Sequence, residues 1–246
     1  AGSPPPERRA CPVDTNRCMS RIAIVAALHD ELSAVLDLMP DEEPTRVAGR
    51  DFWCGHLHGH PVVAVLSRIG KVAAATTAAT LITRFGVERI LFTGVAGGLA
   101  PGVAVGDVVV ADQFVQHDLD VSPLFPRYEI PGYGLAALPA DTELTAVLRA
   151  AAATTLATIP QWLAAETIAA FGLQKPRLHT GLLVSGDRFV ATSAESQALR
   201  AALPGALAVE MEGAAFAQVC HDFAVPFAAV RTVSDRADDS AHVDFL

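Results

Sequence analysis

Residues 206–235 carry the sequence ALAVEMEGAAFAQVCHDFAVPFAAVRTVSD, and the pattern within this stretch decides the fold. Two short apolar runs, 206–211 and 226–234, have the length and composition of buried strands. The segment between them, 212–223, predicts a helix. Short apolar strands separated by helices are typical of α/β proteins.

The same alternation runs through the rest of the chain. It predicts strands at 21–27, 88–93, 107–115 and 178–185, and helices at 30–38, 72–85 and 193–202. It also predicts an antiparallel pair at 46–60 and 61–67, a long loop at 117–140, and helices at 141–152 and 161–171 with Pro160 between them. The expected fold is therefore α/β. It has three layers, helices on either side of a central, mostly parallel, twisted mixed sheet (α/β/α).

The two parts of the chain differ in composition. Residues 1–18 contain Pro4, Pro5 and Pro6, several charges and no apolar period. We interpret them as a disordered leader, left from upstream sequence or from cloning, because they lack the apolar core of a signal peptide. Residues 19–246 are expected to form a single domain, since a chain of this length supports one sizeable core.

Composition excludes several classes of protein. The chain has 246 residues, of which 51% are hydrophobic and 18% charged, so its body does not belong to the disordered class. The net charge is −9 with only 18 Lys and Arg, which argues against nucleic acid and anionic membranes as partners. No stretch reaches the roughly 20 apolar residues of a membrane-spanning helix.

The cysteines show neither metal-binding nor disulfide-framework spacing. We expect unpaired thiols of a cytoplasmic protein. The four residues are Cys11, Cys18, Cys54 and Cys220.

Three histidines alternate at His56, His58 and His60, so a strand would place them on one face. Such a face is a candidate metal site, but no carboxylate or cysteine partner stands at a suitable spacing. A polar hairpin face with Gly59 in the turn is the favoured interpretation, and no metal is expected.

Carboxylates follow three of the predicted strands: Glu31, the pair Glu210 and Glu212, and Asp235. Ligands of such sheets bind beyond the carboxyl ends of the strands, where a carboxylate can act as base, acid or hydroxyl binder. Each also has a structural alternative. Glu31 and Glu212 suit the first turn of a helix, and Asp235 suits the cap of a turn.

Two further segments lie at strand ends. Gly94–Gly98 lets the backbone approach a ligand closely, although close strand–helix packing is an equal alternative. Phe189 offers a ring that can stack on a planar base, whereas a core aromatic is the commoner role of a lone Phe.

Together, several segments carry a resemblance to a known family. They are IAIVAALHDEL (22–32), IGKVAAA (69–75), TGVAGGL (93–99), VGDVVVAD (105–112), HDLDV (117–121), GLLVSGDRFV (181–190), AVEMEGAAFAQVCHDFAVPF (208–227) and VRTVSDRADDSAHVDF (230–245). In these segments the chain resembles the 5′-methylthioadenosine/S-adenosylhomocysteine nucleosidases of the purine nucleoside phosphorylase superfamily. The resemblance covers 19–246 and implies a nucleoside phosphorylase-like fold.

The resemblance implies catalytic roles for four residues. Glu31 matches the base that activates the attacking water, and Asp235 matches the acid that protonates adenine at N7. Glu212 matches the carboxylate that holds the ribose hydroxyls. Arg231 matches an arginine near the catalytic water.

It also implies a set of substrate-binding residues. Phe189 matches the ring stacked on adenine, and the backbone of Val190 matches the contact to its Watson–Crick edge. Val121 and Leu124 match apolar positions that close the pocket from the neighbouring subunit of a homodimer. The remaining members are Ala96 and Gly97 facing base and ribose, Met211 beside the sugar, Glu210 and Ser234 next to the acids, and Phe245 at the 5′-alkylthio end.

The implied activity is hydrolysis of 5′-methylthioadenosine and S-adenosylhomocysteine to adenine and the thioribose product, as in methionine salvage, with no cofactor. Alternatives are another superfamily enzyme, such as a futalosine hydrolase or a nucleoside phosphorylase, or a non-catalytic nucleoside-binding module. Phe92 stands where phosphorylase relatives use a phosphate-binding arginine, which favours water as nucleophile.

Three positions depart from the family. Arg68 replaces a usual glycine, and Val95 replaces a serine near the water. The chain ends at Leu246, where relatives continue into a further C-terminal helix, so that helix is expected to be missing.

Overall fold

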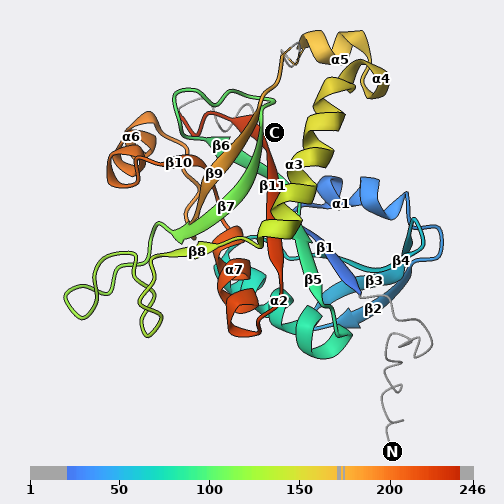
Figure 1. Cartoon of the computed structure of the whole chain (residues 1–246), viewed down its shortest axis with the longest axis horizontal. Coiled ribbons are helices and arrows are strands. Elements are labelled where there is room, and N and C mark those ends of the chain that lie inside the picture. The colour runs from blue at the N-terminus through green and yellow to red at the C-terminus, as the bar shows by residue number, and fades with distance from the viewer. Residues whose placement is uncertain (1–20, 171–172, 174, 239–246) are drawn as a thin grey trace, which may run out of the picture.

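A computed structural model of the chain describes residues 21–170, 173 and 175–238 (Figure 1). The predicted leader, 1–18, lies outside the described residues. Within them the strands form one 11-stranded sheet in the spatial order β2-β3-β4-β1-β5-β11-β6-β10-β9-β7-β8. The strands are β1 (Ile22–Ala26), β2 (Glu43–Val47), β3 (Arg50–Leu57), β4 (His60–Leu66), β5 (Arg89–Phe92), β6 (Val95–Gly98), β7 (Val108–Gln116), β8 (Ala137–Pro139), β9 (Leu178–Ser185), β10 (Ala206–Glu210) and β11 (Phe227–Asp235).

The sheet contains two groups of parallel strands that run in opposite directions. β4, β1, β5, β11 and β6 are parallel neighbours, and so are β10, β9 and β7. Antiparallel pairs join the groups at β6–β10 and at β11–β7. The strands β11, β6, β10, β9 and β7 therefore pair in a closed circuit. The predicted α/β fold with a mixed sheet is confirmed, but strand ends meet around this circuit rather than along one edge of parallel strands.

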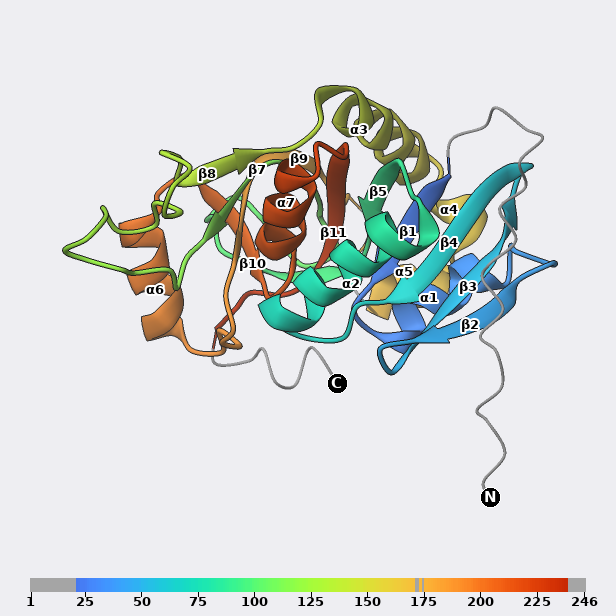
Figure 2. The same ribbon diagram turned by 90° about the horizontal axis from the view of Figure 1, so that it is seen from below.

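Helices cover both faces of the sheet. Along β1, Ala23 and Val25 lie in the core beneath α2, whereas Ala26 packs with Leu32 of α1 on the other face. Figure 2 shows α2 and α7 side by side over the sheet, in agreement with their contacts. The helices are α1 (His29–Leu36), α2 (Lys71–Phe85), α3 (Thr142–Ala157), α4 (Ile159–Trp162), α5 (Ala165–Ala170), α6 (Ser193–Ala202) and α7 (Gly213–Asp222).

Local chemistry explains several helix ends. Gly86 ends α2 with a φ of 61°, a left-handed conformation that glycine adopts without steric cost. The Asp141 side chain accepts from the Leu144 amide at 2.8 Å and so caps α3. Thr192 caps α6 by accepting from the Glu195 amide at 3.3 Å.

A chain of aromatic contacts fills the core between the sheet and α7. The ring centroids of Phe92 and Phe216 are 4.8 Å apart, and those of Phe114 and Phe227 are 5.1 Å apart. These rings fix the positions of β5, β7 and β11 relative to α7, because buried aromatic side chains bring large apolar area into the core.

Two predicted elements have different bounds in the structure. The expected strand at 46–60 is two strands, β2 and β3, because the chain turns at Ala48 and Gly49 with φ of 49° and 75°. Part of the expected glycine-rich loop at 94–98 is strand β6, which pairs with β10 and β11.

Three helical expectations also change. The helix predicted at 30–38 is α1, which begins at His29 and ends at Leu36. Pro160 stands in the first turn of α4 rather than between two helices, as its fixed φ allows. The helix predicted at 141–152 extends to Ala157.

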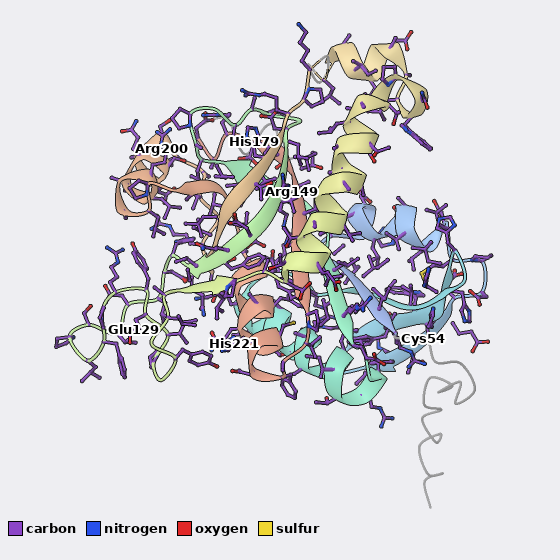
Figure 3. The ribbon with its side chains drawn as sticks, viewed as in Figure 1. Cys54, Glu129, Arg149, His179, Arg200 and His221 are labelled. Carbon is purple, nitrogen blue, oxygen red and sulfur yellow. The ribbon has the colours of Figure 1, made fainter. Side chains whose placement is uncertain are left out.

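The cysteine prediction needs one correction. Cys54 on β3, labelled in Figure 3, is disulfide-bonded, whereas Cys220 is a buried free thiol. Cys11 and Cys18 lie outside the described residues. Burial raises the pKa of the Cys220 thiol to about 12.

One histidine of the β3–β4 hairpin, His56, has a carboxylate partner. His56 Nδ1 lies 2.7 Å from Asp41 Oδ2. Among the residues that the structure describes, no group of three metal-ligating side chains is assembled. None of the described helices is both long enough and apolar enough to cross a membrane.

Candidate active site

A cavity of about 420 Å³ opens where β1, β10 and β11 end and β6 begins. It combines segments that are more than 200 residues apart in the chain. Its lining consists of Ala27, Leu28, Glu31, Ile69, Val95, Ala96, Gly97, Arg188, Phe189, Val190, Val209, Glu210, Met211, Glu212, Ser234 and Asp235.

Three backbone amides hold the Glu31 carboxylate in place. Its Oε2 accepts from the amides of Ala27 and Leu28, each at 2.9 Å. Its Oε1 accepts from the Val95 amide, also at 2.9 Å. These three donors fix the orientation of the carboxylate, which reaches from the first turn of α1 to the first residue of β6.

Glu212 precedes α7 but does not cap that helix. Its Oε1 accepts from the Gly70 amide at 2.8 Å, across the cavity wall. Burial, reinforced by the nearby charge of Glu210, raises the pKa of Glu212 to about 7. A buried carboxylate with such a pKa, facing a cavity, is typical of a functional site.

Asp235 ends β11 and is 3% exposed. Its Oδ1 accepts from the Ala237 amide at 2.6 Å, so the sequence-based interpretation as the cap of a turn is confirmed. Its Oδ2 accepts from the Ser234 hydroxyl at 2.8 Å. Asp235 nevertheless lines the cavity and stands beside Gly97 in the β11–β6 pairing.

Strand β6 therefore brings the two distant acids together. The amide of Val95 holds Glu31, and Gly97, two residues along the same strand, is the neighbour of Asp235. Glu31 and Asp235 therefore both line the same cavity.

Glycine is required at two positions around this strand. A Cβ on Gly94, whose φ is 152°, would lie 2.9 Å from Glu31 Oε1. A Cβ on Gly97 would lie 2.8 Å from the Cβ of Ala237 and 3.0 Å from Asp235 Oδ1. The glycines thus permit close packing around the acids, which was the alternative to a direct approach to a ligand.

Glu210 has a different environment from the other acids. Its carboxylate accepts from the amides of Glu212 and Gly213 and from the Ser185 hydroxyl, and it forms an ion pair with Arg231 at 3.0 Å. The carboxylate therefore secures the start of α7. Glu210 lines the cavity, but its acceptor capacity is occupied by the protein.

Arg231 lies behind the cavity rather than in its lining. It is 2% exposed, and its Nη1 donates to the carbonyls of Phe92 and Val230 at 3.0 and 3.1 Å. Its guanidinium carbon lies 4.0 Å from the centre of the Phe92 ring. In this structure Arg231 supports Glu210 and reaches no cavity surface.

The other predicted binding residues divide into two groups. Ala96, Gly97, Phe189, Val190, Met211 and Ser234 line the cavity as expected. The Phe189 side chain is exposed enough to receive a ligand ring, because 39% of its surface remains accessible. Val121 and Leu124 are not in the lining, and Leu124 is 81% exposed. Phe245 lies outside the described residues.

Sequence analysis assigned no role to five lining residues, namely Ala27, Leu28, Ile69, Arg188 and Val209. Most of them adjoin segments that the sequence had singled out. Arg188 directly precedes Phe189 and forms an ion pair with Glu195 of α6. Ile69 opens the segment 69–75, which carries part of the family resemblance. Its side chain is 57% exposed, a property that the sequence alone does not reveal.

Arg68 points away from the cavity. Its Nη2 donates to the carbonyl of Gly49 in the β2–β3 turn. Its φ is 65°, a left-handed conformation that glycine adopts without steric cost. The guanidinium of Arg68 therefore offers no charge to the cavity.

The chain matches known proteins over nearly its whole length. A family model described as the phosphorylase superfamily matches residues 21–246. A crystal structure of 5′-methylthioadenosine/S-adenosylhomocysteine nucleosidase from Helicobacter pylori is 32% identical, with 92% of this chain and 90% of that chain covered and a TM-score of 0.78. The enzyme of the same name from Neisseria meningitidis, in complex with methylthio-immucillin-A, is 33% identical with the same coverage and TM-score.

A third similar structure carries a different activity in its name. Futalosine hydrolase of Helicobacter pylori is 32% identical, with 92% of this chain and 89% of that chain covered and a TM-score of 0.77. The chain therefore belongs to the phosphorylase superfamily and, within it, to the nucleosidases, which are N-glycosyl hydrolases.

Proposed function

We propose that this enzyme hydrolyses the N-glycosidic bond of 5′-methylthioadenosine and S-adenosylhomocysteine, releasing adenine and the 5-thioribose product. The observation that carries the proposal is the shared cavity of Glu31 and Asp235 along β6. Both acids line one cavity that also has an aromatic ring, that of Phe189, on its wall. A place in methionine salvage follows from these substrates, and no cofactor is required.

The chemistry assigns a different task to each acid. Cleavage develops positive charge on the ribose and negative charge on the leaving adenine. Asp235 protonates adenine at N7 and so neutralises the leaving group. Glu31 takes a proton from the attacking water, and its three amide donors keep the carboxylate aimed at that water.

Glu212 serves the ribose. Its Oε1 accepts from the Gly70 amide, and the residue lines the cavity, where the carboxylate can accept from a sugar hydroxyl. Its carboxylate also favours the cationic sugar of the transition state electrostatically. Met211 packs beside the sugar in this arrangement, and Ser234 orients the acid at Asp235.

The base is held by the segment after β9. Phe189 stacks on adenine, and the backbone of Val190 contacts its Watson–Crick edge. Stacking of an aromatic side chain on a base typically contributes about 1–3 kcal/mol, which suits a site that must retain a flat, neutral ring.

Water is the better nucleophile for this cavity than phosphate. Phe92, at the position of the phosphate-binding arginine in phosphorylases, is 1% exposed and lies against Arg231. Arg68 is bonded to Gly49. Among the lining residues Arg188 is the only basic one, and it is paired with Glu195. An anion would find no free arginine pair among these residues.

A futalosine-type nucleoside is the second candidate substrate. The structure of Helicobacter pylori futalosine hydrolase is as similar to this chain as the nucleosidases are. The residues assigned to the 5′ end, Val121 and Leu124, do not line the cavity of the single chain. The 5′ substituent is therefore the part of the substrate on which the lining places the fewest constraints.

A homodimer would complete that end of the cavity. Leu124 exposes 81% of its surface on the long loop after β7, which suits a residue covered by a second subunit. Sedimentation equilibrium of the wild type and of Leu124→Glu tests this proposal. A monomeric wild-type protein with full activity would contradict it.

A substrate panel tests the activity. Release of the free purine base is followed with 5′-methylthioadenosine, S-adenosylhomocysteine, 5′-deoxyadenosine and a futalosine-type nucleoside, each with and without phosphate. We expect phosphate-independent adenine release from the first two substrates. Strong activation by phosphate would indicate a phosphorylase, preference for the futalosine-type nucleoside would replace the substrate, and binding without cleavage would indicate a non-catalytic module.

A further inference from the structure

Three polar residues next to the cavity form a closed ring of hydrogen bonds. The backbone amide of Lys71 donates to Asp187 Oδ1 at 2.7 Å. The backbone amide of Asp187 donates to Asp118 Oδ2 at 2.9 Å. Asp118 Oδ1 accepts from Lys71 Nζ at 2.6 Å, which closes the ring.

Two members of the ring, Lys71 and Asp118, are partly shielded from solvent, whereas Asp187 is exposed. The side chains of Lys71 and Asp118 are 18% and 30% exposed, and Lys71 Nζ also donates to Gln116 Oε1 at 3.1 Å. Burial raises the pKa of Asp118, but the hydrogen bonds from Lys71 and from the Asp187 amide outweigh burial and hold that pKa below its usual range. A charge pair in this setting is more strongly coupled than an exposed one.

None of the three residues lines the cavity, but two of them, Lys71 and Asp187, adjoin segments that do. Lys71 begins α2 directly after Ile69 and Gly70. Asp187 stands directly before Arg188, Phe189 and Val190, which form the wall assigned to the base. Asp118 follows β7 at the start of the loop that carries Val121 and Leu124.

One residue, Gly70, connects the ring to Glu212, the carboxylate assigned to the ribose. The amide of Gly70 donates to Glu212 Oε1, and the next amide along the chain, that of Lys71, donates to Asp187. A Cβ on Gly70 would lie 3.1 Å from Asp187 Oδ1, so the two segments approach closely at this point. The start of α2 is thus held between the residue that binds ribose and the segment that binds the base.

We infer that Lys71, Asp118 and Asp187 are positioning residues that fix the spacing between the ribose wall and the base wall of the cavity. The inference rests on the proposed function for the identity of the ligand. The physical basis is that ribose and adenine form one rigid unit around the scissile bond, so the two walls must be in register. A misplacement of about 1 Å between reacting groups can cost about 100-fold in rate.

A substitution series separates positioning from general stability. We expect Lys71→Met, Asp118→Asn and Asp187→Asn to lower kcat/KM for 5′-methylthioadenosine by about 10- to 100-fold. Lys71→Arg keeps the charge and a donor and should recover most of the loss. The double variant Lys71→Met/Asp118→Asn should be no worse than either single variant, because both changes open the same ring.

Asp51→Asn is the matched control. Asp51 forms an exposed ion pair with Arg46 at 3.2 Å on the β2–β3 hairpin and lines no part of the cavity. It receives the same substitution as Asp118, and its kcat/KM should stay within about twofold of the wild-type value. Equal losses in the ring variants and in this control would overturn the inference.

Hydrogen exchange gives a readout that does not depend on catalysis. The amides of 69–71 and 187–190 should exchange at least about tenfold faster in Lys71→Met than in the wild type, and at an unchanged rate in Asp51→Asn. Unchanged exchange at both segments in Lys71→Met would contradict the inference. A wild-type protein that releases no adenine would contradict the proposed function alone, since the exchange comparison would still decide the role of the ring.

Discussion

Two regions of the molecule bury carboxylates, and they differ in what surrounds the oxygens. One is the cavity with Glu31, Glu212 and Asp235. The other is Asp107, 2% exposed, at the amino end of β7. Asp107 is as deeply buried as Asp235, so burial alone does not distinguish them.

The surroundings of Asp107 are those of a structural residue. Its oxygens accept from the amides of Arg177 and Ala104 at 2.8 and 3.0 Å, and Oδ2 lies 2.7 Å from Nε2 of His179, which Figure 3 labels at the start of β9. Burial raises the pKa of Asp107, but hydrogen bonds, led by that from His179, hold it below the usual range.

Glu212 shows the contrast. Glu212 lines the cavity and has a raised pKa, although the Gly70 amide donates to its carboxylate. The comparison teaches that access to a cavity and a raised pKa, rather than burial alone, mark a carboxylate that is available for chemistry.

The largest expected effect tests the cavity acids directly. Glu31→Gln and Asp235→Asn should each lower kcat by about 10²- to 10⁴-fold, because each removes one proton-transfer group. Steady-state adenine release measures the loss, and circular dichroism checks the fold. A near-normal rate in either variant would refute the role assigned to that residue.

Glu212 should make stability depend on pH with the opposite sign to Asp107. A carboxyl with a raised pKa binds its proton more tightly in the folded state, so its contribution to stability is lost as pH rises from its ordinary value of 4.5 to about 7. Relative to the wild type, Glu212→Gln should gain up to about 3 kcal/mol in the free energy of unfolding at pH 8, and nothing below about pH 4.5, at 1.36 kcal/mol per pKa unit.

Urea unfolding of both proteins at several pH values measures this difference. The same variant should lose affinity for the nucleoside, because an amide replaces the ribose carboxylate. A constant stability difference from pH 4 to pH 8 would show that Glu212 titrates normally.

Asp107→Asn should affect stability and leave the chemistry intact. The amide cannot accept all of the donors around Asp107, and an unsatisfied buried group costs about 1–3 kcal/mol. The destabilisation should be largest at neutral pH and shrink as the pH falls through the lowered pKa of Asp107, because there the wild-type carboxylate is also lost.

Thermal melts and kcat of Asp107→Asn, measured below its melting temperature, test this expectation. A melting temperature equal to that of the wild type, or a kcat reduced as in Asp235→Asn, would remove the distinction between the two regions.

The smallest effect is expected at Arg68. This residue directly precedes Ile69 of the cavity lining, but its own side chain does not line the cavity. Arg68→Gly should leave kcat/KM within about twofold, because the guanidinium binds Gly49. The stability change should stay within about 1 kcal/mol, since glycine suits the φ of 65° but adds freedom to the unfolded chain. A large loss of activity would place the Arg68 charge in the mechanism.

Much of the fold was predictable from the alternation of apolar runs. β9 and α6 have the predicted bounds, 178–185 and 193–202, because each has clear apolar periodicity and clear end signals. β2 was not predicted, since the residues of this edge strand are largely exposed and polar. β6 was missed because its strand character comes from pairing with β10 and β11 rather than from its own glycine-rich sequence.

The candidate site was predictable in its acids and less so in their tasks. Glu31, Glu212 and Asp235 stand at or shortly after the ends of strands, and all three line one cavity. Sequence did not separate Glu210 from Glu212, because the difference depends on Arg231 reaching Glu210 from another strand. The antiparallel junctions of the sheet, which also shape the cavity, depend on long-range pairing that local patterns do not encode.

One assay tests the central claim most directly: adenine release from 5′-methylthioadenosine in phosphate-free buffer by wild type, Asp235→Asn and Asp107→Asn, all folded and at equal concentration. The account predicts comparable rates for wild type and Asp107→Asn and a loss of at least about 100-fold for Asp235→Asn. Unimpaired release by Asp235→Asn, or none by the wild type, would contradict it.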